Sequence, residues 1–341
     1  MLATETQVSY VRWIAAACAA VVLLLAAWAA ADVLFLLFGC ILFAQPLAAA
    51  ADFVSSRTRI SRGAALSLVL VTTAAICFLV GWMVAGRIAD QTRDLADTLP
   101  KAVRQLGDKL QQNEWGQRAL NAFNNFRSGL ENREILGRAT GVFSSSAGLI
   151  AKFYILLFGT LFIAADPGLY KRGLIRLFPP DHRERIDDAL SEAGATLRAW
   201  LLGKLLLMGY VAAVTMIGLS LLGVPMAITL GLFAGLADFV PNFGPLAAFI
   251  PAGLIALTIH PMMVVWVGLL YYGAQVSENY VLTPIVQRRV SKLAAAVIIF
   301  SQVILGVLFG AQAVLFAEPL AAAGQVLIKK LYVDTLEEGS Q

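Results

Sequence analysis

Residues 235–251 read GLADFVPNFGPLAAFIP, and they decide the fold because they interrupt a long apolar stretch with polar and helix-breaking residues. The stretch contains one carboxylate, Asp238, one amide, Asn242, and three prolines. Proline lacks a backbone N–H and disrupts a helix, whereas glycine permits turn geometry. We therefore expect non-helical backbone between two short helices. The residues expected to break the helix are Pro241, Gly244 and Pro245.

The composition predicts a membrane protein. The chain has 341 residues, of which 59% are hydrophobic and 14% are charged, and its mean hydropathy is +0.76. Soluble domains carry about 25% charged residues, so much of this chain is expected to face lipid. The net charge of +4 is spread along the chain without a basic cluster among aromatic residues, which argues against a nucleic-acid partner. The expected class is an all-α polytopic membrane protein whose partner is the lipid bilayer.

Uncharged runs near 20 residues predict helical membrane spans. About eight membrane-embedded segments are expected, and two of them should be proline-broken or re-entrant hairpins, at 225–259 and 293–331. The other six are expected at roughly 13–31, 33–51, 64–86, 146–165, 200–222 and 262–284.

The same pattern divides the chain into six regions, of which two are polar insertions between spans. They are three transmembrane helices at 1–86, an amphipathic helical extracytoplasmic insertion at 87–140, a transmembrane helix at 141–165, a cytoplasmic amphipathic helix at 166–199 that lies along the inner membrane surface, a core with broken helices at 200–331, and a cytoplasmic tail at 332–341.

Positive charge predicts the orientation, because cytoplasmic loops are enriched in Lys and Arg. The short loop SSRTRISRG, residues 55–63, follows the second span and carries three arginines. Both termini are therefore expected in the cytoplasm, which requires each hairpin to enter and leave on the same side. The basic residues behind this assignment are Arg57, Arg59, Arg62, Arg288, Arg289, Lys292, Lys329 and Lys330.

Charged residues are rare in the second half of the chain. The 89 residues from 199 to 287 contain three formal charges, Lys204, Asp238 and Glu278. A charge at the bilayer centre costs about 2.5–3.5 kcal/mol, so it persists where it faces a polar cavity or a partner. Lys204 is near a helix start and is expected to extend to the interface, away from any site. Asp238 is either part of a polar site or the solvated cap of a surface turn.

A second polar group follows on the next span. Gln275, Glu278 and Asn279 lie at i, i+3 and i+4, so on a helix they share one face that should turn inward. Pro284 follows and is a further candidate gate residue. In addition, residues 306–320 repeat the order of residues 231–245, with glycine and apolar residues, then an acid and a proline. Repeated broken segments of this kind indicate a transporter site.

Three stretches resemble the bacterial autoinducer-2 exporter-like transporter family. They are GVPMAITLGLFAGLADFVPNFGPLAAFIPAG at 223–253, ENYVLTPIVQRRV at 278–290, and GVLFGAQAVLFAEPLAAAGQVL at 306–327. The resemblance implies a homo-oligomeric permease of about eight spans in the bacterial inner membrane. Members are linked to export of a small signalling molecule or to sodium/proton exchange. The family often continues after the second stretch with a glycine-rich turn and a histidine–proline pair, whereas residues 286–300 read VQRRVSKLAAAVIIF.

The resulting expectation is a secondary active transporter that exports a small solute. The chain has no G-x-x-x-x-G-K-[ST] phosphate loop, so an ion gradient should supply the energy, and a proton or sodium ion is the only expected cofactor. Asp238 and Glu278 would bind the ion, and Asn242, Gln275 and Asn279 would supply neutral ligands. Two alternatives stay open, a sodium (lithium)/proton antiporter and a passive pore or membrane scaffold.

Catalysis and a metal site are not expected. Intramembrane proteolysis needs a nucleophile with a base, a HExxH pair or two aspartates. The chain has two histidines, His182 and His260, no HExxH, and a single aspartate in 225–284. The spacing of the three cysteines matches neither a zinc site nor a redox pair.

Overall fold

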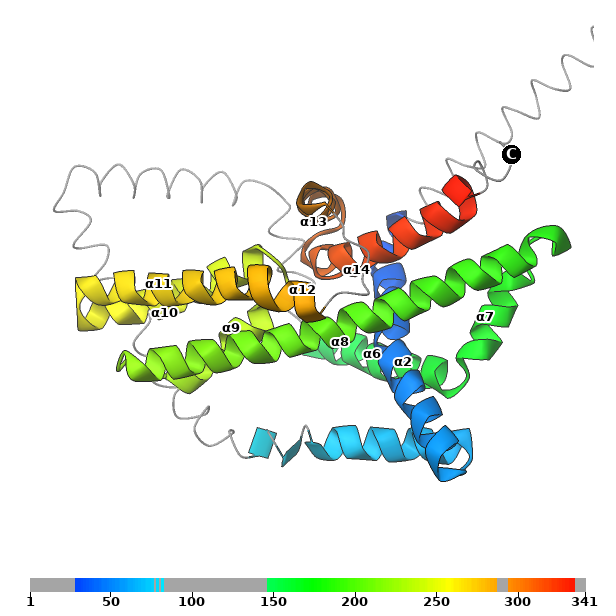
Figure 1. The fold of residues 1–341 in the computed structure, drawn as a ribbon, viewed down its shortest axis with the longest axis horizontal. Helices are drawn as coiled ribbons and strands as arrows, with labels where there is room; N and C mark the ends of the chain where they lie inside the picture. The colour runs from blue at the N-terminus through cyan, green and yellow to red at the C-terminus, as the bar shows by residue number, and fades with distance from the viewer. Residues whose placement is uncertain (1–27, 77, 80, 83–145, 287–293, 335–341) are drawn as a thin grey trace, which may run out of the picture.

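The computed structural model describes residues 28–76, 78–79, 81–82, 146–286 and 294–334 (Figure 1). Within these ranges every regular element is a helix, so the predicted all-α polytopic class is confirmed. The insertion predicted at 87–140 and most of the first predicted span lie outside the described residues.

Two helices are long and apolar enough to cross a bilayer, α2 (Ala31–Thr58) and Pro180–Leu221. The second comprises a short 3₁₀ turn and α8 (Arg183–Leu221). A third candidate is the pair α6 (Ser146–Ala165) and α7 (Pro167–Ile175), which bends by 83° at the break. Asp166 caps α7 there by accepting a hydrogen bond from the Leu169 N–H, and Pro167 fixes the first helical position.

Helix α8 joins two regions that the sequence analysis predicts as separate segments. Its 39 residues extend about 58 Å, roughly twice the thickness of the hydrocarbon core. The surface helix predicted up to residue 199 and the span predicted from residue 200 are one unbroken helix, because no proline interrupts α8 and its apolar stripe continues through Leu197, Trp200 and Leu201. Figure 1 shows α8 running past both the α9–α11 group and the α2–α14 group.

The predicted hairpin at 225–259 consists of α9 (Ala227–Ala237) and α10 (Phe243–Ile259). The 11 residues of α9 extend about 16 Å, about half of the ~30 Å core, so α9 alone is too short to cross a bilayer. Helix α9 packs closely along α8: a Cβ added at Gly235 would lie 2.6 Å from the Met208 carbonyl oxygen. Helix α11 (Pro261–Ser277) then returns beside α10.

The predicted hairpin at 293–331 consists of α13 (Ala295–Phe309) and α14 (Ala311–Ile328), followed by a π-helical turn, Lys329–Val333. The chain reverses at Gly310, whose φ of 81° and ψ of −168° are essentially restricted to glycine. Pro319, the counterpart of the breaking prolines in the first hairpin, lies inside α14.

The chain between the two hairpins contains a local distortion. After α11 the backbone becomes π-helical over Glu278–Leu282, with the Thr283 N–H bonded to the Glu278 carbonyl, and α12 (Thr283–Val286) follows. Pro284 has no N–H to donate, which favours such an irregular turn just before it. Single π-helical turns are frequent at functional sites.

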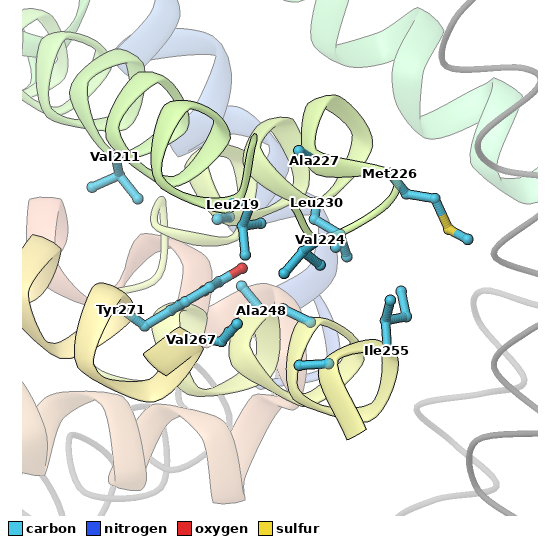
Figure 2. Close-up of a cluster of buried hydrophobic side chains, with 13 residues drawn as sticks. Val211, Leu219, Val224, Met226, Ala227, Leu230, Ala248, Ile255, Val267 and Tyr271 are labelled. Atoms are coloured by element: carbon cyan, nitrogen blue, oxygen red, sulfur yellow. The ribbon is translucent and has the colours of Figure 1, made fainter. Parts of the chain in front are cut away.

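The largest apolar cluster joins α8, α9, α10 and α11 (Figure 2). Tyr271 directs its hydroxyl group into this cluster, towards Leu219 and Leu230. Two smaller clusters join α2 to α6 and helix Arg62–Ile76, and α2 to α8 and α14. Helix α8 thus contributes to the packing of both hairpins.

Candidate functional site

An ion-paired group of three side chains lies between α8, the tip of the first hairpin and the end of α11. The Lys204 Nζ donates to Asp238 Oδ2 at 2.9 Å and lies 3.8 Å from Glu278 Oε1. All three side chains are at most 4% exposed. We call Lys204, Asp238 and Glu278 the buried triad.

The expectation that Lys204 extends to the membrane interface is wrong. Lys204 shares the buried face of α8 with Trp200, Leu207 and Val211, and this face packs on α9 and α11. The ammonium therefore pairs with carboxylates that lie closer than the interface. The spacing of these four residues, 4, 3 and 4, is a helical stripe, so the sequence did carry a signal that places Lys204 inward.

The turn between α9 and α10 holds Asp238 in place. Asp238 ends α9, with its N–H bonded to the Ala234 carbonyl at 3.0 Å. Pro241, Asn242 and Phe243 then form a γ-turn, in which the Phe243 N–H donates to the Pro241 carbonyl at 2.8 Å. The predicted break is therefore present. Asn242 has a φ of 67°, a region that non-glycine residues rarely occupy.

Gly244 and Pro245 lie in the first turn of α10, where a missing N–H is tolerated. Gly244 is buried, and a Cβ at this position would overlap the Ala237 carbonyl, so only glycine lets α10 start this close to the end of α9. Close packing of the two helices therefore accounts for Gly244, and contact with a solute is not needed to explain it.

Gln302 on α13 supports the same turn and was missed by the sequence analysis. Its side chain is 1% exposed, and its Nε2 donates to the Pro241 carbonyl at 3.3 Å. The Pro241 carbonyl already accepts the γ-turn bond from the Phe243 N–H, and Gln302 donates to its second lone pair. Gln302 thereby connects the second hairpin to the tip of the first.

The group predicted on α11 is partly assembled. Gln275 is half-buried and its Nε2 donates to Glu278 Oε2 at 3.0 Å. Asn279 is exposed, because in the helical turn the residue next to Glu278 points to a different side. Asn242 and Pro284 are exposed too. Among the described residues neither asparagine side chain hydrogen-bonds to a triad carboxylate, so their role as ligands stays a prediction.

Several buried polar atoms near the triad lack a hydrogen-bond partner within the described part of the chain. They are Asp238 Oδ1, Gln302 Oε1, Glu318 Oε2 and Trp200 Nε1. Three of the four are oxygen acceptors, the atom type that binds protons and hard cations. In the described ranges no group of three His, Cys, Asp or Glu side chains could hold a metal ion.

Polar contacts also fix the second hairpin at both ends. At its tip, Gln312 bonds with Asp32 of α2, and Lys152 of α6 donates to Gln312 Oε1 at 3.3 Å. At its base, Arg185 of α8 donates to the Lys330 carbonyl at 2.9 Å. The tip therefore lies at the start of α2, and the base lies beside the polar half of α8.

Comparison with known proteins gives a consistent result. The sequence model of one protein family, described as AI-2E family transporter, matches residues 18–332 of this chain. YrrI of Bacillus subtilis is 27% identical over 195 residues, 56% of this chain, and the chain spans 55% of YrrI. The protein sll0060 of Synechocystis sp. is 24% identical over 278 residues, 76% of both chains. A Thermotoga maritima protein is 27% identical over 226 residues, 60% of this chain and 68% of its own. All three relatives carry provisional names as transport proteins.

Proposed function

Because this chain belongs to the AI-2E family of transporters, and is therefore a membrane transport protein, we propose that it is a secondary active transporter that exports a small solute. A cation gradient drives the export, and the coupling cation, a proton or a sodium ion, binds at the buried triad. The chain carries its solute across the membrane without transforming it.

The observation that carries this proposal is the charge of the buried triad. Two carboxylates face one ammonium, so the ionised triad has one uncompensated negative charge. An uncompensated charge at membrane depth is costly, and uptake of one monovalent cation neutralises it. Asp238 Oδ1 is buried and has no hydrogen-bond partner among the described residues, which suits it to take the proton or cation.

Uptake of the cation would loosen the contact between α8 and the first hairpin. The Lys204–Asp238 pair is the charged link between these elements, and a neutral Asp238 attracts the ammonium less. Two arrangements of the hairpin tip, with and without this link, provide the two states that alternating access requires. Pro241, Gly244 and Pro245 shape the tip, and Pro284 lies at the end of the π-helical turn.

We propose that the chain lies in the bacterial inner membrane with both termini in the cytoplasm and assembles as a homo-oligomer. Arg57 and Arg59 are exposed at the end of α2, and the half-buried Arg62 at the start of the next helix bonds with the Ala164 and Ala165 carbonyls at the end of α6. These ends therefore lie on one side, which the positive-inside rule makes cytoplasmic. Native mass spectrometry of the protein in detergent tests the assembly, and a monomeric mass would contradict it.

The test of function uses purified protein in sealed vesicles. Under an imposed pH gradient or sodium gradient, wild-type protein should move a panel of small solutes against their own gradients. Asp238→Asn and Glu278→Gln should each lower this flux at least tenfold while the protein still inserts. Glu192→Gln, which removes an exposed acid of α8, is the matched control and should retain flux. Full flux by both site variants would refute the proposal.

Sodium (lithium)/proton antiport is a second candidate, favoured by the oxygen-rich character of the triad. Carboxylate and amide oxygens suit Na⁺ and H⁺ alike. The same vesicles separate the candidates: sodium-driven alkalinisation or acidification of the vesicle lumen without any added solute supports antiport. Proton movement that depends on a solute supports export, and equilibration without accumulation identifies a passive pore.

A further inference from the structure

Glu318 lies on α14, where this helix packs against α8, and the triad does not include it. Its side chain is half-buried, and its Oε2 is sealed from solvent without a hydrogen-bond partner among the described residues. Pro319, the next residue, is less than 2% exposed. A carboxylate oxygen that is sealed from solvent is costly to leave without a donor, so a donor from α8 that reaches Oε2 would stabilise Glu318.

Two candidate donors project from one face of α8. Trp200 and Lys204 are four residues apart and are therefore neighbours on the helix surface. The indole Nε1 of Trp200 is buried and lies close enough to the Glu318 carboxylate to act on it as a donor, which places Glu318 against this face of α8. Lys204 is close enough to attract the Glu318 carboxylate electrostatically, although the two do not form an ion pair in this structure.

The Lys204 ammonium has capacity for a further acceptor. An ammonium group has three N–H donors, and the bond to Asp238 Oδ2 uses one of them. The contact with Glu278 Oε1, at 3.8 Å, is longer than a hydrogen bond. Lys204 can therefore move between carboxylates without losing a hydrogen bond.

Few other charged groups face Glu318. Helix α8 contributes Lys204, the hairpin turn contributes Asp238, and the π-helical turn contributes Glu278 beyond them. Helix α13, which packs on α14, carries no charged side chain in its described length, and α2 presents uncharged side chains to this region, such as Phe38 and Leu42. Among these elements Lys204 is the cation that can compensate Glu318.

We propose that Glu318 is the alternative partner of the Lys204 ammonium and thus a further residue of the ion site. When Asp238 takes up the coupling cation, whose identity rests on the proposed function, the ammonium moves from Asp238 to Glu318. A buried ion that loses its partner is strongly destabilised, and this exchange keeps the ammonium paired in both states. It also transfers the charged contact of α8 from the first hairpin to the second.

A double-mutant cycle tests this exchange without any transport. Asp238→Asn imitates the neutralised aspartate, and Glu318→Gln removes the alternative partner while keeping the side-chain shape. Alone, Glu318→Gln should leave the thermal unfolding midpoint in lipid nanodiscs unchanged or raise it. Combined with Asp238→Asn, it should lower the midpoint by at least about 5 °C more than the two single shifts together. Glu192→Gln is the control and should combine additively with Asp238→Asn.

Additive midpoints for Asp238→Asn and Glu318→Gln would overturn the proposal. If the double variant does not fold, a cryo-EM structure of Asp238→Asn alone decides the question. The expected density places the Lys204 ammonium about 3 Å from a Glu318 oxygen. An ammonium that stays beside Glu278, with Glu318 unpaired, would overturn it. Neither measurement depends on transport. A result that contradicts the role of Glu318 can therefore be told apart from a result that contradicts the proposed function.

Discussion

Lys204 and the two carboxylates around it dominate the energetics at the scale of single residues. Each of the three side chains is at most 4% exposed, so water compensates none of their charges. A buried ion pair contributes little net stability, but removal of one partner leaves an uncompensated charge and is strongly destabilising. Variants that change one charge of the triad should therefore affect stability and transport together.

Lys204→Met should destabilise the protein by about 3 kcal/mol, because Asp238 and Glu278 then repel each other in the membrane interior. Coupled flux should be lost. Unfolding in mixed micelles followed by circular dichroism measures the stability. Lys171→Met is the control, because Lys171 pairs with Asp187 at 2.8 Å on a partly exposed surface, where such pairs contribute at most about 1 kcal/mol. Equal losses in both variants would contradict the account.

Asn242→Gly separates the two roles that Asn242 could have. Glycine accepts the φ of 67° and relieves about 1 kcal/mol of backbone strain, so the variant should keep full coupled flux and equal or greater stability. A tenfold or larger loss of flux would instead support the predicted ligand role of the amide. Asn242→Val introduces a β-branched side chain that disfavours this φ, so it should be less stable than both the wild-type protein and Asn242→Gly.

At the scale of elements, both hairpins were predictable because prolines, glycines and topology limit where helices continue. The turn at Asp238–Asn242 follows from Pro241 within it and Pro245 shortly after it. The reversal at Gly310 was not predicted in position, because sequence similarity between the two hairpins directs attention to Pro319, which an already formed helix tolerates. The pairing of Lys204 was not predicted either. The helical stripe that it shares with Trp200, Leu207 and Val211 points Lys204 inward, but the carboxylates that it meets depend on contacts between helices far apart in sequence.

Close packing of α9 on α8 should be sensitive to single methyl groups. Gly235→Ala places a Cβ 2.6 Å from the Met208 carbonyl oxygen and the Ala212 Cβ, so it should destabilise the protein by about 1–3 kcal/mol. Gly209→Ala on α8 is the matched control, because a Cβ there meets nothing within 4 Å. Denaturant unfolding of both variants is the measurement. A Gly235→Ala protein as stable as the control would show that the two helices are further apart.

At the scale of the whole molecule, polar contacts join the ends of helices that are far apart in sequence, and the triad lies buried between α8, α9 and α11. The tip of the second hairpin bonds with the start of α2, and Arg62, at the start of the helix after α2, bonds with the end of α6. Composition was sufficient to predict a membrane protein, because so few charges are available for a soluble surface. Which helix ends contact each other was not predictable, since this depends on contacts between helices far apart in sequence.

Cysteine labelling should show that both ends of the first hairpin are on the same side. Pro225→Cys and His260→Cys, placed at exposed positions before α9 and after α10, should react with a membrane-impermeant maleimide from the extracytoplasmic side. Ser56→Cys, exposed near the end of α2, should react only after the membrane is opened. The native cysteines are first replaced. Labelling of Pro225→Cys and His260→Cys from opposite sides would mean that the hairpin crosses the membrane.

The central claim is that the buried triad takes up a cation at membrane depth. Charge displacement after a rapid pH jump or sodium jump tests it most directly, on vesicles adsorbed to a solid-supported membrane and without any added solute. Wild-type protein should give a transient current with at least one of the two cations, and Asp238→Asn combined with Glu278→Gln should reduce it at least tenfold. A wild-type transient that the double variant retains in full would contradict the account.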